Sequence, residues 1–178
     1  YLYDEDRWPS GTAGGQVTRE HGEEGMLMLV STPASEADED NTVAMFAVEL
    51  DDAGYLLSYE AVGAADRVPD GKTGLAFVSR PVPAIPWFND APYLDTMSAD
   101  AVGELLRITH RAYADRYGKD FGELIPAIFT DEPNYAFFRD VPFRPGEGLL
   151  PWTPQMPREF KKRRGYDVRD HLPELIHP

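Results

Sequence analysis

The sequence contains no cysteine and is poor in positive charge. The absence of cysteine excludes a disulfide framework, a thiolate metal site and a cysteine nucleophile, and it leaves the cellular compartment open. Lysine and arginine number 17 against 31 aspartates and glutamates, which gives a formal net charge of −14. Such a charge repels phosphate backbones and anionic membranes, so we expect neither nucleic acid nor membrane as a partner. A neutral, polyhydroxylated substrate fits this balance better.

Several familiar catalytic and targeting signals are also missing. The sequence has no stretch of apolar residues long enough to span a membrane and nothing that resembles a signal peptide. Neither a phosphate-binding loop nor a dinucleotide fingerprint is present. The Gly-x-Ser-x-Gly elbow of serine hydrolases and the His-Glu-x-x-His zinc motif are likewise absent, so those two chemistries have little support.

An apolar run that ends abruptly in two acids is the most informative stretch. Residues 124–129 are apolar, and Asp131, Glu132 and Pro133 follow. This pattern predicts a buried strand that delivers carboxylates at its carboxyl end, where α/β folds bind their ligands. Glu132 is therefore the first candidate for a catalytic group. The alternative is that Asp131 caps a turn and that Glu132 is only solvated.

The first fifteen residues repeat this plan. A short apolar strand end is followed by Asp4 and Glu5, and then by a loop rich in glycine that carries Trp8. An aromatic ring beside carboxylates suits a sugar, because its C–H face packs on the ring while its hydroxyls bond to the acids. The alternative is a core tryptophan that anchors the loop.

Residues 16–84 have a different character. Strands are predicted at 26–30, 42–50, 55–62 and 74–78, with a hairpin turn at 51–54, so we expect a small inserted antiparallel β-subdomain. The acidic segment 36–41 lacks the glycine and terminal glutamate of an EF-hand loop. A solvated connection is therefore a better interpretation than a calcium site, and no metal ligand set is predicted.

The remainder is read as a helix followed by a strand and then by two further helices. Residues 81–93 are rich in proline and aromatics, and a helix is predicted from Ser98, its N-cap, to Tyr117. His110 borders the apolar stripe of this helix, either as a structural histidine or as a substrate contact. A further helix is predicted between Thr153 and Gly165, and a short one to residue 176.

Paired carboxylates beside aromatic side chains are typical of glycoside hydrolases. Cleavage of a glycosidic bond needs one carboxylic acid to protonate the leaving oxygen and one carboxylate to act as base or nucleophile. We therefore assign candidate catalytic roles to Glu132, Glu5 and Asp131. Candidate substrate contacts are the neighbouring polar and aromatic side chains Asp4, Trp8, Trp87, Asn89, Tyr93, Asp95, His110, Tyr135 and Trp152.

Six short segments together carry a resemblance to a known family. They are Tyr3–Gly11, Trp87–Asn89, Tyr93–Thr96, Thr109–Tyr113, Phe129–Pro133 and Arg164–Asp167. With them the chain resembles bacterial glycoside hydrolases of the α-L-rhamnosidase type. The resemblance implies an α/β fold, a partial (β/α) TIM-type barrel formed by residues 1–15 and 85–178, with residues 16–84 as the inserted β-subdomain.

The same resemblance implies the roles of individual residues and a partner. In the related clan of barrel hydrolases a glutamate after the fourth strand is the acid/base, and Glu132 matches that position, although Asp131 stands where that clan has asparagine. The second carboxylate is Glu5 or lies outside this chain. The rest of the same polypeptide would then complete the barrel. The related enzymes can use calcium, but the sequence offers no ligand set for it.

A rival hypothesis keeps the aromatics without the chemistry. A carbohydrate-binding module, or an inactive barrel fragment, would bind sugar through Trp8, Trp87 and Trp152 and would not cleave it. A third hypothesis, an interaction domain unrelated to sugars, leaves the acids at the strand ends unexplained.

Overall fold

The structure is a computed structural model that describes residues 1–5, 7–20, 25–135 and 148–177. The chain divides into two compact units. The first is formed by the described parts of residues 1–27 and 81–141, and the second by those of 28–80 and 142–178. Each unit therefore takes two separate stretches of the chain.

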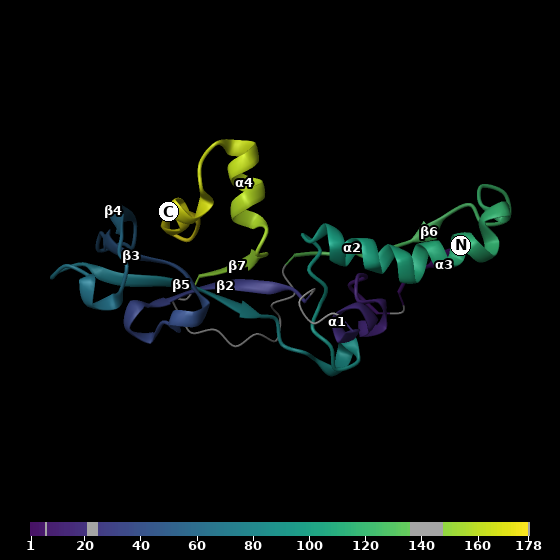
Figure 1. Cartoon of the computed structure of the whole chain (residues 1–178), viewed down its shortest axis with the longest axis horizontal. Helices are drawn as coiled ribbons and strands as arrows, with labels where there is room; N and C mark the ends of the chain where they lie inside the picture. The colour runs from purple at the N-terminus through teal and green to yellow at the C-terminus, as the bar shows by residue number, and fades with distance from the viewer. Residues whose placement is uncertain (6, 21–24, 136–147, 178) are drawn as a thin grey trace. The chain divides into compact units, whose positions relative to one another are not determined.

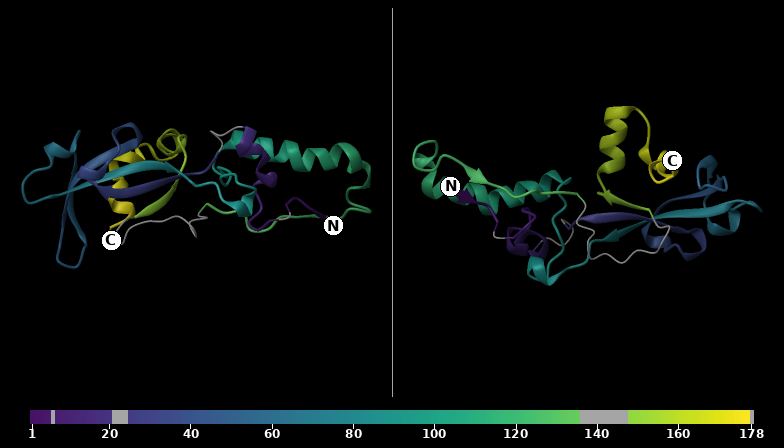
Figure 2. Two further views of the ribbon diagram at one scale, coloured as in Figure 1. Left: turned by 90° about the horizontal axis from the view of Figure 1, so that it is seen from below. Right: turned by 180° about the vertical axis from the view of Figure 1, so that it is seen from behind.

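The first unit is built on one long helical segment and a short parallel strand pair. Strands β1 (Leu2–Tyr3) and β6 (Ile128–Phe129) pair in parallel. Helices α2 (Ala99–Leu106) and α3 (Ala112–Tyr117) are joined by the π-helical segment η7 (Arg107–Arg111), and the views of Figure 2 show them as one continuous rod. The short elements are η1 (Ala13–Gly15), α1 (Gln16–Glu20), η6 (Pro86–Phe88) and η8 (Gly118–Asp120).

A small core holds the long helix to the first loop. Val17 of α1, Leu94 and Ala101 of α2 are fully buried together, and Leu105 and Ile108 pack against them. Ser98 is the N-cap predicted from the sequence, since its hydroxyl accepts a hydrogen bond from the Ala101 amide. This core fixes the loop after β1 against the helix that precedes β6.

The second unit is a mostly antiparallel sheet of five strands in the order β4-β3-β5-β2-β7 (Figure 1). The strands are β2 (Leu27–Pro33), β3 (Thr42–Leu50), β4 (Leu56–Ala61), β5 (Thr73–Pro81) and β7 (Leu149–Trp152). Strand β3 pairs antiparallel with both β4 and β5. The short helices η3 (Ala34–Glu36), η4 (Glu39–Asn41) and η5 (Ala65–Arg67) lie in its connections, and α4 (Met156–Arg164) and η9 (Val168–Leu175) follow β7.

The core of the second unit comes from runs of consecutive buried residues in the central strands β2, β3 and β5. Phe46 of β3 contacts Phe77 of β5 and Tyr59 of β4 edge to face, with ring centroids 5.9 and 5.7 Å apart. Residues 28–32 of β2 are all buried, which is the burial of a central strand covered on both faces. Strand β7 joins at the edge of β2, where the Ser31 amide donates to the Gly148 carbonyl at 2.9 Å.

The predicted fold class is wrong. A TIM-type barrel needs parallel strands that alternate with helices, whereas here the main sheet is mostly antiparallel and the parallel pair β1–β6 has two residues in each strand. The main sheet is the mostly antiparallel one that the sequence analysis took for an insertion, and β7, α4 and η9 belong to the same unit. The strand patterns were correct locally. The pairing of β2 with β7, however, joins residues that are 117 positions apart in the sequence, Ser31 and Gly148.

The apolar run before the acids is also not the buried strand that was predicted. Only Ile128 and Phe129 are in a strand, and Leu124 is 79% exposed. Residues 120–125 instead form a turn closed by the Gly122 amide on the Ile125 carbonyl at 3.0 Å, with Gly122 at a φ of +85°. A short apolar run does not reveal by itself whether it is buried.

Candidate active site

The two acidic segments follow neighbouring parallel strands. Leu2 pairs with Ile128 and Tyr3 with Phe129, and the Asp4 amide donates to the Phe129 carbonyl at 3.3 Å. The two strands are parallel, so their carboxyl ends lie at the same end of the pair. Asp4 and Glu5 follow β1 there, and Asp131 and Glu132 follow β6. The two acidic segments therefore follow the two strands of one short parallel pair.

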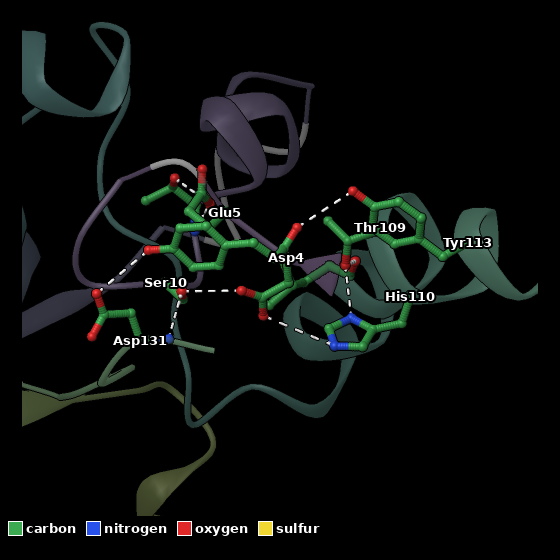
Figure 3. Close-up of polar contacts among 10 residues, drawn as sticks. Asp4, Glu5, Ser10, Thr109, His110, Tyr113 and Asp131 are labelled. Atoms are coloured by element: carbon green, nitrogen blue, oxygen red, sulfur yellow. Dashed lines mark hydrogen bonds and ion pairs between the residues drawn. The ribbon is translucent and has the colours of Figure 1, made fainter. Parts of the chain in front are cut away.

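Ser10 connects the two acidic segments (Figure 3). Its amide donates to the Asp131 carbonyl at 2.7 Å, and its hydroxyl accepts from the Asp131 amide at 2.9 Å. The same hydroxyl donates to Asp4 Oδ1 at 3.1 Å. Tyr93, which is fully buried, donates its hydroxyl to the Ser10 carbonyl at 2.6 Å. Ser10 was not among the site residues predicted from the sequence. Its only signal there was its place in the turn Pro9-Ser10-Gly11.

Tyr93 is placed as a support for this connection. Burial raises the pKa of its hydroxyl to about 12, so the hydroxyl is protonated and able to donate at neutral pH. It also accepts a long bond of 3.4 Å from the Asn134 amide. Tyr93 thereby joins Ser10 to the segment that follows Glu132.

Glu5 faces inward and holds its own loop. Its side chain is buried, with the residue 6% exposed, and Oε2 accepts hydrogen bonds from the Thr12 amide at 3.0 Å and the Thr12 hydroxyl at 2.7 Å. Oε1 accepts a third bond from the Gly14 amide at 3.2 Å. These bonds hold a loop in which Ala13 and Gly14 both have positive φ. The arrangement favours a loop-holding role for Glu5, and its catalytic role stays a prediction.

Glu132 is exposed and sits on a strained backbone. Its φ is +47°, in the left-handed region that costs a non-glycine residue energy and that often marks functional sites. The Trp8 indole N–H donates to its Oε2 at 3.0 Å. Asp131 is partly buried beside it, and the Tyr3 hydroxyl donates to Asp131 Oδ2 at 3.4 Å. The pKa of Tyr3 is raised by burial and by this carboxylate.

Trp8 is itself held by a second tryptophan. The Trp87 indole N–H donates to the Trp8 carbonyl at 2.6 Å, and the Arg7 guanidinium lies 5.1 Å from the centre of a Trp87 ring. Trp8 is 39% exposed and Trp87 48% exposed. The alternative of a core tryptophan is therefore excluded for Trp8, whose partly exposed indole adjoins the Glu132 carboxylate and is followed by a second partly exposed indole at Trp87.

A cavity of about 580 Å³ opens beside β1 and the long helix. Its lining includes Tyr3, Asp4, Thr109, Tyr113 and Arg116. Figure 3 shows the Asp4 carboxylate between Ser10 and His110, with His110 Nε2 3.9 Å from Asp4 Oδ2.

The histidine and the nearby helix side chains are positioned by the helix itself. The Thr109 hydroxyl donates to the Leu105 carbonyl at 2.7 Å and lies 2.8 Å from His110 Nδ1. The Tyr113 hydroxyl donates to the Tyr3 carbonyl at 3.4 Å. The cavity thus offers a carboxylate, a guanidinium and aromatic rings to a ligand, and His110 lies beside the Asp4 carboxylate outside the lining.

The other residues predicted to contact substrate have varied positions. Asn89 has a φ of +57° and donates to the Gly14 carbonyl at 3.1 Å, so it supports the Glu5 loop. Asp95 is buried and accepts from the Met97 amide at 2.9 Å, just before the N-cap of α2. Tyr135 is 56% exposed. Trp152 ends β7 in the second unit and is buried there.

No metal centre emerges from the described side chains. Within the described ranges, no three histidines, aspartates or glutamates gather closely enough to hold an ion. In the acidic segment 36–41, Asp38 accepts hydrogen bonds from the Asp40 amide and the Asn41 side chain and so caps its own turn. The structure offers no positive support for calcium in this segment.

Across the part of the chain that the structure describes, no helix has the length and hydrophobicity needed to cross a bilayer. Comparison with known proteins finds no family model, no curated protein and no solved structure that matches the sequence or the fold.

Proposed function

We propose that this protein binds carbohydrate and hydrolyses glycosidic bonds, with Glu132 as the general acid/base. The observation that carries the proposal is the exposed Glu132 carboxylate, held at a φ of +47° and bonded by the indole of Trp8 beside a second exposed tryptophan. A protonatable carboxyl beside aromatic faces is the arrangement that glycoside cleavage uses. The resemblance to α-L-rhamnosidase-type hydrolases is part of the same proposal.

The second carboxylate of the proposed reaction is Asp131. It is partly buried beside the Tyr3 hydroxyl, and its backbone is fixed by Ser10, whereas both oxygens of Glu5 are engaged by the 12–14 loop. In the proposed reaction Glu132 protonates the leaving oxygen, and Asp131 acts as the base or nucleophile. Asp4 and Tyr113, which line the neighbouring cavity, and His110 beside Asp4 are the proposed contacts for sugar hydroxyls.

The test is a pair of matched substitutions. Glu132→Gln keeps the size of the side chain and removes its proton chemistry, so turnover of a panel of nitrophenyl glycosides should fall at least about 100-fold. Glu123→Gln makes the same change at an exposed position of the 120–125 turn and should leave turnover unchanged. Equal turnover in the wild type and Glu132→Gln would remove the acid/base role.

A second candidate function is carbohydrate binding without cleavage. The buried Glu5 favours it, because both oxygens of this carboxylate are engaged by the 12–14 loop. In that case the wild type turns over none of the glycosides but binds an oligosaccharide saturably. Trp87→Ala should then weaken the binding, since it removes an exposed ring and the bond that holds Trp8.

A further inference from the structure

A second cavity, of about 280 Å³, lies in the second unit and takes no part in the site described above. It is formed by the end of β7, helix α4 and η9. Its lining side chains include Trp152, Met156, Phe160, Tyr166, His171 and Glu174. Apart from His171 and Glu174, the described residues that line it are apolar or aromatic. The cavity is thus an apolar chamber with one polar end.

The aromatic walls are held in a fixed arrangement. Phe160 and Tyr166 meet edge to face with ring centroids 5.2 Å apart, and Tyr166 meets the His171 ring in the same way at 4.9 Å. Trp152 is only 5% exposed. Ring edges and faces that are already oriented suit the insertion of another flat ring.

The polar end is centred on the Glu174 carboxylate. Its Oε1 accepts a hydrogen bond from the Tyr59 hydroxyl of β4 and lies 2.9 Å from His171 Nδ1. Its Oε2 takes part in neither contact. The bond from Tyr59, followed by that from His171, lowers the pKa of Glu174, so the carboxylate is ionised at neutral pH and is a strong acceptor.

We propose that this cavity binds a small aromatic molecule that carries one hydrogen-bond donor, with its ring among Trp152, Phe160 and Tyr166 and its donor on Glu174. A volume of about 280 Å³ is at the lower end of ligand pockets and suits one or two rings. A sugar is excluded as the occupant because the apolar walls would leave most of its hydroxyls without partners. The role of Trp152 is then distinct from the sugar contact predicted for it.

The first test titrates the full chain with 4-methylphenol, a single ring with one hydroxyl, by calorimetry. Saturable binding to one site is expected. Met156→Trp fills the cavity and should weaken the binding at least about tenfold. Leu57→Trp adds the same side chain on the exposed face of β4 and should leave it unchanged. The proposal fails if the wild type shows no saturable binding, or if Met156→Trp binds as the wild type does.

A second pair of variants tests whether Glu174 accepts a hydrogen bond from the ligand or only supports η9. Glu174→Gln replaces a charged acceptor by a neutral one of the same size, and the affinity should fall about tenfold. Tyr59→Phe removes a bond to Glu174 from outside the cavity, and the affinity should stay within about twofold. An equal loss in both variants would overturn the direct contact with Glu174. Tighter binding of methyl α-glucoside than of 4-methylphenol would overturn the assigned ligand class.

Discussion

Single side chains decide whether the acidic segments are catalytic or structural. Glu5 and Glu132 both follow a short strand, yet one is buried under three hydrogen bonds and the other is exposed beside an indole. The difference arises because Thr12 and Gly14 return their donors to Glu5, whereas Glu132 precedes a proline that has no N–H to donate.

Ser10 should be the most sensitive polar residue of the first unit. Ser10→Ala leaves Asp4 Oδ1 and the partly buried Asp131 amide without their partner, so the free energy of unfolding should fall by about 1–3 kcal/mol. Urea denaturation followed by circular dichroism measures this change.

The matched control for Ser10 is Ser58. Its hydroxyl also donates to a carboxylate, Glu49, at 2.8 Å, but the pair is exposed on the sheet. Ser58→Ala should therefore change the stability by less than about 0.5 kcal/mol. Equal losses at both positions would show that Ser10 does not join the two segments.

The free energy of unfolding of the second unit should depend on pH through the ionisation of Asp167. Hydrogen bonds from the Arg169 side chain, and then from the Arg169 amide, lower the pKa of Asp167 to about 2. Because the folded-state pKa lies below the unfolded value of about 3.9, the stabilisation is complete above pH 4 and is lost as the pH falls towards 2.

The measurement compares the wild type with Asp167→Asn. The variant keeps an N-cap residue but cannot ionise, so its free energy of unfolding should fall less steeply between pH 4 and pH 2 than that of the wild type. Parallel pH profiles of the two proteins would contradict the assignment.

Short elements meet through glycines that leave no room for a side chain. At Gly15, which has a φ of +75°, an added Cβ would lie 2.7 Å from the Ala91 Cβ and 2.8 Å from the Phe88 carbonyl oxygen. This close approach brings η1, which belongs to the loop that Glu5 holds, against η6 in the first unit.

The prediction at this scale is that Gly15→Ala destabilises more than a positive φ alone would do. Both the strained backbone and the collision should lower the stability, by about 2–4 kcal/mol together. Gly54→Ala, at a φ of +88° with open space around its Cβ, should show the backbone cost of about 1 kcal/mol only. Thermal unfolding of the two variants separates the cost of the strained backbone from the cost of the collision. Similar losses of stability in both variants would contradict the predicted contact.

Across the whole molecule, each unit is closed by a stretch from a distant part of the chain. Strand β7 covers the edge of β2, and Leu172 of η9 is fully buried. Residues 16–84 alone would therefore leave an apolar strand edge and part of a core open to water.

Removal of residues 148–178 should consequently abolish cooperative unfolding of the sheet and cause association. Size-exclusion chromatography and urea denaturation test this expectation against a control that lacks only residues 177 and 178, which should remain folded. A monomeric, cooperatively folded protein without residues 148–178 would show that the sheet needs no closing segment.

The sequence by itself determined the elements whose causes are local. Strand β3 has the predicted bounds 42–50, the Asp51 side chain closes the predicted hairpin turn, and Ser98 and Gly165 begin and end their helices as expected. Alternation, turn chemistry and capping act over a few residues, so they can be read along the chain.

Only the tertiary structure decided which of these elements belong together. It paired β7 with β2, turned Glu5 inward and Glu132 outward, buried Trp152, and made Ser10 the link between the two acidic segments. Each of these outcomes depends on contacts between residues far apart in sequence, whose free energies arise from burial and from buried hydrogen bonds rather than from local pattern.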